Sequence, residues 1–314
     1  MSQNQRPLLG FFLALIASMT WGSLPLAAQQ VLKAMDAPTL VWSRFVVAAI
    51  VVFGLLWYRK GLPQLNQISR KTWLIIAMAV VGLTFNFTLY SQALLYISPT
   101  TNQVLWQFAP FGMILIGVML FGEKMGVYQK IGSGLLMIGL IAFFNNHFGE
   151  LFQMGHYAIG ILLGSAAALI WVMYGVAQKL LLEKFTSSQI LLLIYFGCAL
   201  LLSPIASPSQ LGNLHGALWG FFGFCCANTL IGYGAFGESL NRWDASKVSV
   251  ITTMAPIFTM IFSLLAHAVN PERFAAVDMN TVSYIGVLVV VAGAVLAVAG
   301  DKLLKKNSTL ETFD

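Results

Sequence analysis

Runs of apolar residues, separated by short charged segments, extend along the whole chain. Four runs without a charged residue each have the length of one membrane span: 7–32, 151–178, 248–271 and 279–300. Two further spans are indicated at 131–149 and at 37–58, where Arg44 is the one charged residue. The runs 72–122 and 185–237 are each long enough for two spans of about 20 residues, with natural breaks at Ser98–Pro99 and from Ser203 to Pro208. The pattern predicts ten spans.

The runs are continuously apolar and lack the alternating polarity of membrane β-strands, so we expect every span to be a helix. Of the 314 residues, 58% are hydrophobic and 9% are charged, and the mean hydropathy is +0.81. A soluble domain has about 25% charged residues, so this chain has too few polar residues to cover itself in water. We predict an all-α membrane protein with no domain outside the bilayer.

The basic residues indicate how the chain is oriented. With the N-terminus in the cytoplasm, 14 of the 17 Lys and Arg residues fall in cytoplasmic segments, Arg44 falls within a span, and Lys33 and Arg273 face the other side. This bias predicts that both termini are cytoplasmic, and we expect a multi-pass protein of a bacterial inner membrane. Topology explains the formal net charge of +6, which gives no reason to expect nucleic acid as a partner.

The two halves of the chain resemble each other. With a constant shift of 146 residues, the following align: Trp73 with Trp219, Val104 with Val250, and Ala109–Pro110 with Ala255–Pro256. With small gaps, further matches are Glu123 with Glu272, Gly132 with Gly286, and Gly139 with Gly293. Residues 1–150 and 151–314 would each hold five spans, and because five is odd the second repeat is inverted. Inverted repeats are typical of secondary transporters.

Several of these residues resemble a known family. They are Trp21–Gly22, Arg44, the stretch from Ser98–Pro99 to Pro110, Gly122–Glu123 and Gly132, and in the second half Ala245–Ser246 to Pro256, Glu272 and Gly286. Together they are similar to the EamA-type branch of the drug/metabolite transporter superfamily. The resemblance implies ten helices in a 5+5 inverted repeat, a cavity lined mainly by helices 1 to 4 and 6 to 9, and transport of small metabolites, amino acids or drugs. The second half departs from the family pattern where Val172 follows Trp171.

Three prolines lie inside predicted spans: Pro25, Pro110 and Pro256. Each removes a backbone donor and frees the carbonyl four residues earlier, so a bend is expected. Membrane helices also carry proline for packing alone. The correspondence of Pro110 with Pro256 across the repeats favours a shared hinge or gate.

Polar residues form one matched stripe in each half. Gln103, Gln107 and Pro110 share a helical face, and the same spacing recurs in Ser249, Thr253 and Pro256. Such stripes suit a solute site near the middle of the membrane. The alternative is hydrogen bonding that holds neighbouring helices together.

Aromatic and amide side chains accompany the stripes in other spans. They are Trp21, Asn86, Tyr90, Trp106, Trp171, Tyr174, Gln178, Asn228 and Tyr233. Trp and Tyr offer flat apolar faces with one polar atom, which suit an amphipathic solute or an ammonium group. Many such residues instead anchor the membrane interface, so both roles stay open for each of them.

Ionisable residues limit the mechanism. Arg44 lies about 10 Å into its span. There it either extends to the outer interface, binds a carboxylate or neutralises the cavity. No carboxylate occupies the middle of a span, so proton antiport, uniport and coupling through the charge of the solute are all compatible with the sequence.

Motifs of intramembrane enzymes and ATP-driven pumps are absent, and cysteine and histidine spacings suggest no metal site. We predict a secondary transporter of small organic solutes, in particular an exporter of amino acids or related metabolites, with no catalytic residue, metal or cofactor. A membrane channel or a receptor for a small amphipathic ligand is the alternative. The expected partners are the solute and the lipid bilayer. The sequence does not indicate whether the protein is a monomer or an oligomer.

Overall fold

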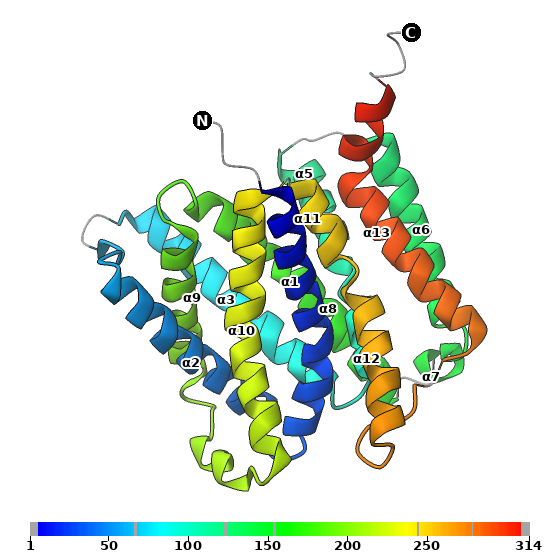
Figure 1. Cartoon of the computed structure of the whole chain (residues 1–314), viewed down its shortest axis with the longest axis horizontal. Coiled ribbons are helices and arrows are strands. Elements are labelled where there is room, and N and C mark those ends of the chain that lie inside the picture. Colours follow the sequence, from blue (N-terminus) through cyan, green and yellow to red (C-terminus); the bar gives the residue numbers. More distant parts are fainter. Residues whose placement is uncertain are drawn as a thin grey trace.

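The apolar runs form helices, and the described residues contain no strand (Figure 1). The computed structural model describes residues 6–65, 68–121, 125–152, 155–243, 245–277 and 279–308. The helices of the first half are α1 (Pro7–Val31), α2 (Ala37–Tyr58), α3 (Arg70–Ala93), α4 (Pro99–Leu105), α5 (Phe108–Phe121), α6 (Val127–Phe143) and α7 (Phe148–Phe152). Those of the second half are α8 (His156–Leu181), α9 (Ser187–Leu202), η2 (Pro208–Asn213), α10 (Ala217–Arg242), α11 (Ala245–Thr252), α12 (Ala255–Val269) and α13 (Thr281–Ser308).

Six segments of the described chain are long and apolar enough to cross a membrane: Pro7–Val31, Ala37–Tyr58, Arg70–Ala93, His156–Gln178, Lys247–Val269 and Thr281–Gly300. The helices α6 and α9 are apolar but shorter. The predicted all-helical membrane fold is confirmed. Both predicted breaks are present, because α4 begins at Pro99 and α9 ends at Leu202. Glu123, which the repeat aligns with Glu272, lies outside the described residues.

Side chains that precede the helices determine where several of them begin. Asp36, Ser69, Ser98 and Thr186 each accept a hydrogen bond from the backbone N–H three residues later. The first N–H groups of a helix lack partners in that helix, and such a cap satisfies one of them. Ser98 is followed by Pro99, whose missing N–H is tolerated at the first helical position. The turn after α3 therefore leads directly into α4.

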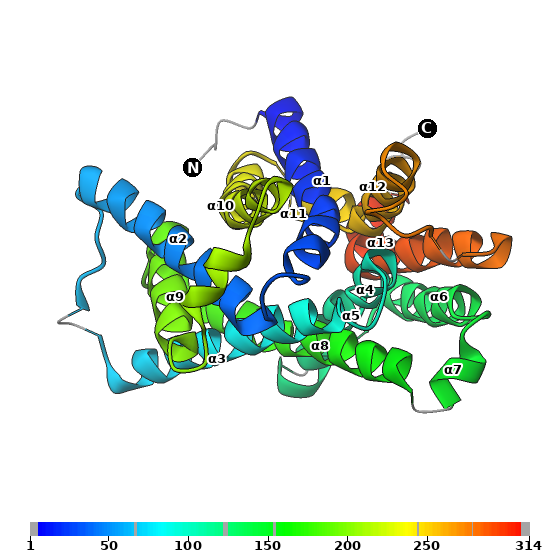
Figure 2. The ribbon, with the colours of Figure 1, turned by 90° about the horizontal axis from the view of Figure 1, so that it is seen from below.

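Helices of the two sequence halves pack in matched pairs. α1 lies against α10 as α3 lies against α8, and α2 packs on α9. α6 packs on α13 at the right-hand side of Figures 1 and 2. Exchange of the two predicted repeats would turn the α1/α10 pair into the α8/α3 pair. α1 begins and α13 ends at the same, upper end of the helical body in Figure 1.

Glycines bring the backbones of α6 and α13 into contact. A Cβ atom added at Gly139 would lie 2.5 Å from the Val290 amide nitrogen, and one added at Gly132 would lie 2.5 Å from the Gly293 carbonyl oxygen. We call this contact between α6 and α13 the glycine seam. In it Gly132 faces Gly293, the counterpart of Gly139, while Gly139 faces Gly286, the counterpart of Gly132. Aligned residues therefore make equivalent contacts, as an axis that relates two repeats requires.

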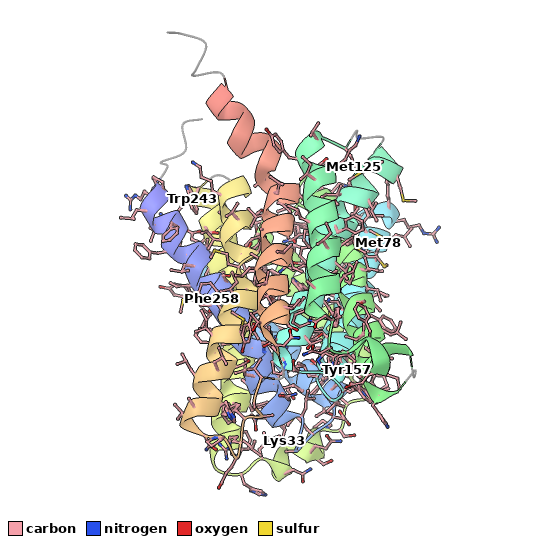
Figure 3. All side chains as sticks on the ribbon, turned by 90° about the vertical axis from the view of Figure 1, so that its right-hand side faces the viewer. Lys33, Met78, Met125, Tyr157, Trp243 and Phe258 are labelled. Atoms are coloured by element: carbon pink, nitrogen blue, oxygen red, sulfur yellow. The ribbon has the colours of Figure 1, made fainter. Side chains whose placement is uncertain are left out.

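The departure from the repeat pattern at Val172 has a packing reason. Gly22 of α1 lies against α12, where an added Cβ would come within 2.8 Å of the Phe258 Cβ atom (Phe258 is labelled in Figure 3). At the corresponding crossing of α8 with α5, the Val172 side chain packs onto Gly112. Position 112 corresponds to 258 in the 146-residue shift. In one crossing the glycine is on α1 and the large residue on α12, and in the other the glycine is on α5 and the large residue on α8. Both crossings stay filled although the sequence symmetry is lost.

We predict that Gly132→Ala destabilises the protein. The added methyl group would collide with the Gly293 carbonyl oxygen, and overpacking of this kind costs about 1–3 kcal/mol. Gly134→Ala on the same helix is the matched control, because nothing lies within 4 Å of a Cβ atom added there. Thermal unfolding in detergent should show a lower melting temperature for Gly132→Ala alone. Equal melting temperatures would contradict the close seam.

Candidate solute site

Two helical segments are interrupted beside prolines. α4 ends at Leu105 and α5 begins at Phe108, two residues before Pro110. α11 ends at Thr252 and α12 begins at Ala255, one residue before Pro256. α1, by contrast, continues through Pro25 as one helix. Action of the three prolines as a hinge or gate stays a prediction.

The two interruptions meet between the halves. The Gln107 side-chain amide donates a hydrogen bond to the Thr253 backbone oxygen, 3.3 Å away, and these two residues are equivalent in the 146-residue shift. The carbonyls that the prolines release also have partners. The Trp106 oxygen accepts from the backbone N–H of Ala109 at 2.9 Å, and the Thr252 oxygen accepts from a serine hydroxyl of α1 at 3.5 Å. Irregular backbone at membrane depth is tolerated where protein groups satisfy it, as they do at this junction.

Trp106, at the end of α4, joins two other helices through ring contacts. Its centroid lies 5.7 Å from that of Tyr90 on α3 and 5.9 Å from that of Trp171 on α8, both edge to face. Trp171 lies 6.0 Å from Tyr174 on its own helix. Aromatic pairs at such separations contribute about 0.5–1.5 kcal/mol beyond their burial. The predicted aromatic residues of these three helices are therefore brought together.

A second set of rings joins α1, α10 and α3. Trp21 lies 5.5 Å from Tyr233, and Tyr233 is stacked at 6.3 Å on Phe87. One buried apolar core connects the two sets, because it contains Phe87 and Tyr174 and because Trp171 and Tyr233 pack against it. We name the combined set the aromatic cluster: Trp21, Phe87, Tyr90, Trp106, Trp171, Tyr174 and Tyr233.

The two asparagines predicted from the sequence are buried and connect helices. The Asn86 amide donates to the Ala167 carbonyl at 2.8 Å and links α3 to α8, and the Asn228 amide donates to the Thr20 carbonyl at 2.5 Å and links α10 to α1. Interhelical bonding, which the sequence offered as the alternative for polar residues, is thus present for both asparagines. Contact of either with a solute stays a prediction.

The remaining predicted polar residues lie in three places. The Gln103 side chain accepts a hydrogen bond of 2.6 Å from the Tyr90 hydroxyl, at the edge of the aromatic cluster. Gln178 is half-buried on α8, one turn beyond Tyr174. The Thr253 hydroxyl donates to the Ser249 carbonyl at 2.6 Å across the end of α11.

Arg44 is buried inside the helical body. Its exposed fraction is 2%, its Nε donates to the Thr229 hydroxyl at 3.1 Å, and its guanidinium carbon lies 4.8 Å from the centre of the Phe87 ring. This position excludes extension of Arg44 to the outer interface. Thr229 and Phe87 were not predicted. They directly follow Asn228 and Asn86, but adjacent residues of a helix point in different directions, so the spacing gave no signal for them.

The start of α2, the helix that carries Arg44, is bonded to η2. Asp36 accepts from the Thr39 N–H at 2.8 Å and exchanges two hydrogen bonds with Gln210 of η2. Burial raises the pKa of Asp36, but the hydrogen bonds from Thr39 and Gln210 outweigh burial and lower the pKa below its usual value. The carboxylate is therefore ionised at neutral pH, and it ties α2 to the segment after α9.

Two hollows open at the end of the molecule that carries Lys33, opposite the end that carries Trp243 (Figure 3). One has a volume of about 300 Å³ and is lined by Gln29, by the turn between α3 and α4, and by Phe274–Val277. The other, of about 470 Å³, is lined by Gln30, Lys33, His215, Leu218, Asn270, Glu272 and Arg273. Both halves of the chain contribute to each hollow. In the part of the chain that the structure describes, His, Cys, Asp and Glu form no group that could hold a metal ion.

Comparison with known proteins decides the family. The EamA-like transporter family matches residues 8–145 of this chain and matches it again over residues 158–299. The chain belongs to the EamA-like transporter family. It is accordingly a membrane transporter, as the sequence predicted, and its two matched segments are similar in extent.

Several proteins are similar to this chain over nearly their full length. An "Uncharacterized transporter" of Haemophilus influenzae is 50% identical over 301 residues, 96% of this chain and 98% of the relative. The "Uncharacterized inner membrane transporter YhbE" of Escherichia coli K12 is 41% identical over 312 residues, 98% and 97% of the two chains. A "Probable amino-acid metabolite efflux pump" of the same organism is 20% identical over 305 residues, 92% and 94% of the two chains. A solved crystal structure with 19% identity has the same fold, with a TM-score of 0.66 over 95% of this chain and 97% of that one.

We predict that Gln107→Leu lowers the free energy of unfolding by about 0.5–1.5 kcal/mol, the usual contribution of one hydrogen bond. Leucine keeps the approximate size of the side chain but cannot donate to the Thr253 carbonyl. Ser133→Ala is the control, because it removes a buried hydroxyl of α6 that has no hydrogen-bond partner in the described structure. Thermal unfolding of both variants checks this. Equal losses for the two variants, or none for Gln107→Leu, would mean that the contact between the interruptions does not stabilise the fold.

Proposed function

We propose that this chain is a secondary transporter that moves small organic solutes by alternating access. In this proposal residues 1–150 and 151–314 are inverted repeats of five spans each. Each interrupted segment, α4 with α5 and α11 with α12, then counts as one span. The two family matches, the exchanged helix pairs and the glycine seam of α6 with α13 support the repeat.

The observation that carries the proposal is the junction of the two interruptions beside the aromatic cluster. A site between inverted repeats can be exposed to each side in turn when one repeat rocks against the other. Gln107 and Thr253 come from opposite repeats and touch there. The proposed solute contacts are the residues expected from the sequence: Trp21, Arg44, Asn86, Tyr90, Gln103, Trp106, Gln107, Trp171, Tyr174, Gln178, Asn228, Tyr233, Ser249 and Thr253. Pro25, Pro110 and Pro256 are the proposed hinge or gate positions.

Amino acids or related metabolites are the proposed solutes, and efflux is the proposed direction. Ring faces, amides and hydroxyls around a single buried arginine suit a zwitterionic amphipathic solute, whereas a phosphate ester calls for several Lys or Arg residues. The name of the more distant Escherichia coli relative, an amino-acid metabolite efflux pump, agrees with this class.

The proposed location is the bacterial inner membrane, with both termini in the cytoplasm. The strong excess of basic residues on one side of the predicted topology supports this orientation. The name of the YhbE relative, an inner membrane transporter, supports location in the inner membrane. Lys33 then lies at the outer end of the molecule and Trp243 at the cytoplasmic end (Figure 3).

Counterflow in proteoliposomes tests the function. Vesicles preloaded with one unlabelled amino acid, amine or nucleobase should transiently accumulate the same labelled compound, because a carrier exchanges solute across its site. Uptake should also saturate with concentration. Flux that rises linearly without counterflow would favour a channel, and binding without any flux would favour a receptor. Empty vesicles and vesicles with heat-denatured protein are the controls.

A further inference from the structure

Arg44 is a buried cation without an anionic partner in the described part of the chain. Its Nε donates to Thr229, whose hydroxyl in turn donates to the Cys225 carbonyl at 3.4 Å. No Asp or Glu carboxylate in the described ranges lies within 4.0 Å of Arg44, and no other hydrogen bond of its guanidinium group is found there. A neutral hydroxyl and the face of Phe87 offset only part of the cost of removing this charge from water.

A second polar group beside Arg44 also lacks a partner. Tyr195 of α9 is 1% exposed, and its hydroxyl has no hydrogen-bond partner in the described structure. Phe45 directly follows Arg44 on α2. The Tyr195 ring contacts Phe45, at 5.8 Å, and Phe45 contacts Phe87, at 4.9 Å. Arg44 and Tyr195 therefore lie in one aromatic environment, each with unused donor capacity.

We infer that Arg44 and Tyr195 form a binding site for the carboxylate of the transported solute, which restricts the solutes to carboxylic acids. The planar guanidinium group presents paired N–H donors that match the two oxygens of a carboxylate, and Tyr195 supplies a further O–H donor. One unpaired cation balances one carboxylate, whereas a phosphate dianion would keep an excess charge. Ionisable residues within membrane spans generally mark the path of a solute.

This site adjoins the aromatic cluster. Phe87 touches Arg44 and is stacked on Tyr233, which contacts Trp21. A carboxylate held by Arg44 therefore leaves the rest of the solute among ring faces, which accept an apolar chain or an ammonium group. The site therefore makes carboxylic acids the substrate class of the transporter proposed above, and the inference rests on that proposal.

Binding of matched ligands to the purified full-length protein tests the inference. The probes are the proteinogenic amino acids and simple 2-oxo acids, followed by the uncharged amide of the tightest binder. Wild-type protein should bind the acid roughly 10-fold or more tighter than the amide, as expected for a charged hydrogen-bonded pair. Arg44→Gln should lose that preference, with weaker binding of the acid and unchanged binding of the amide. Tyr195→Phe should weaken binding of the acid by roughly 3-fold or more.

Two controls separate a ligand site from a structural role. Arg242→Gln removes an arginine that is already paired with Glu238, and Ser133→Ala removes a buried hydroxyl of α6 that has no hydrogen-bond partner in the described structure; neither should alter binding of the acid. Without solute, Arg44→Gln should melt at the wild-type temperature or above, because it removes an unpaired buried charge. A lower melting temperature with an unchanged preference for the acid would show that Arg44 only supports the fold.

Three other results would overturn the inference. Equal affinity of the wild type for acid and amide would do so, as would binding of chloride with no carboxylic acid bound. Counterflow restricted to amines or other solutes without a carboxylate would also contradict it, while leaving the proposed transport function intact. Absence of counterflow for every solute would instead remove the proposed function itself.

Discussion

Inside a membrane, every backbone amide and carbonyl needs a partner within the protein, and the arrangement around Pro110 and Pro256 depends on this constraint. Each proline removes one donor from a span. The released carbonyls are satisfied by a tight turn at Trp106 and by a hydroxyl of α1 at Thr252. Such interruptions can persist only where protein surrounds them. They meet between the two halves of the chain, which is where an alternating site has to lie.

Equivalent helix crossings in the two halves of the chain are filled by different residues. Side-chain volume is conserved at equivalent crossings although residue identity is not, as the exchange of Gly22 and Phe258 for Val172 and Gly112 illustrates. Along α6 and α13, by contrast, the aligned glycines have kept both identity and contact. At these backbone contacts the glycine leaves no room for a side chain, whereas a side-chain contact can be filled from either helix. The aligned glycines of α6 and α13 therefore match in both halves, whereas the residues at the side-chain crossing have changed identity.

Much of the fold, and part of the site, could be predicted from the sequence. Apolar runs, prolines and the 146-residue repeat gave the helical membrane fold and the breaks at Pro99 and after Leu202, since these features depend on local chemistry. The partners of polar side chains could not be predicted. Asn86 and Asn228 were expected beside a solute, and each bonds to the backbone of a neighbouring helix. The depth of Arg44 in its span gave its distance from the interface but not the direction of its side chain, so its burial against Phe87 and Thr229 required the packed structure.

The central claim is that one site between the two halves is exposed to each side of the membrane in turn. A single cysteine at position 249, in a protein whose buried cysteines Cys198, Cys225 and Cys226 are replaced by alanine, allows a direct measurement in sided proteoliposomes. An impermeant thiol reagent should label Ser249→Cys from either side, and a transported solute should slow the labelling from both. Labelling from one side only, whatever solute is present, would contradict alternating access at this site.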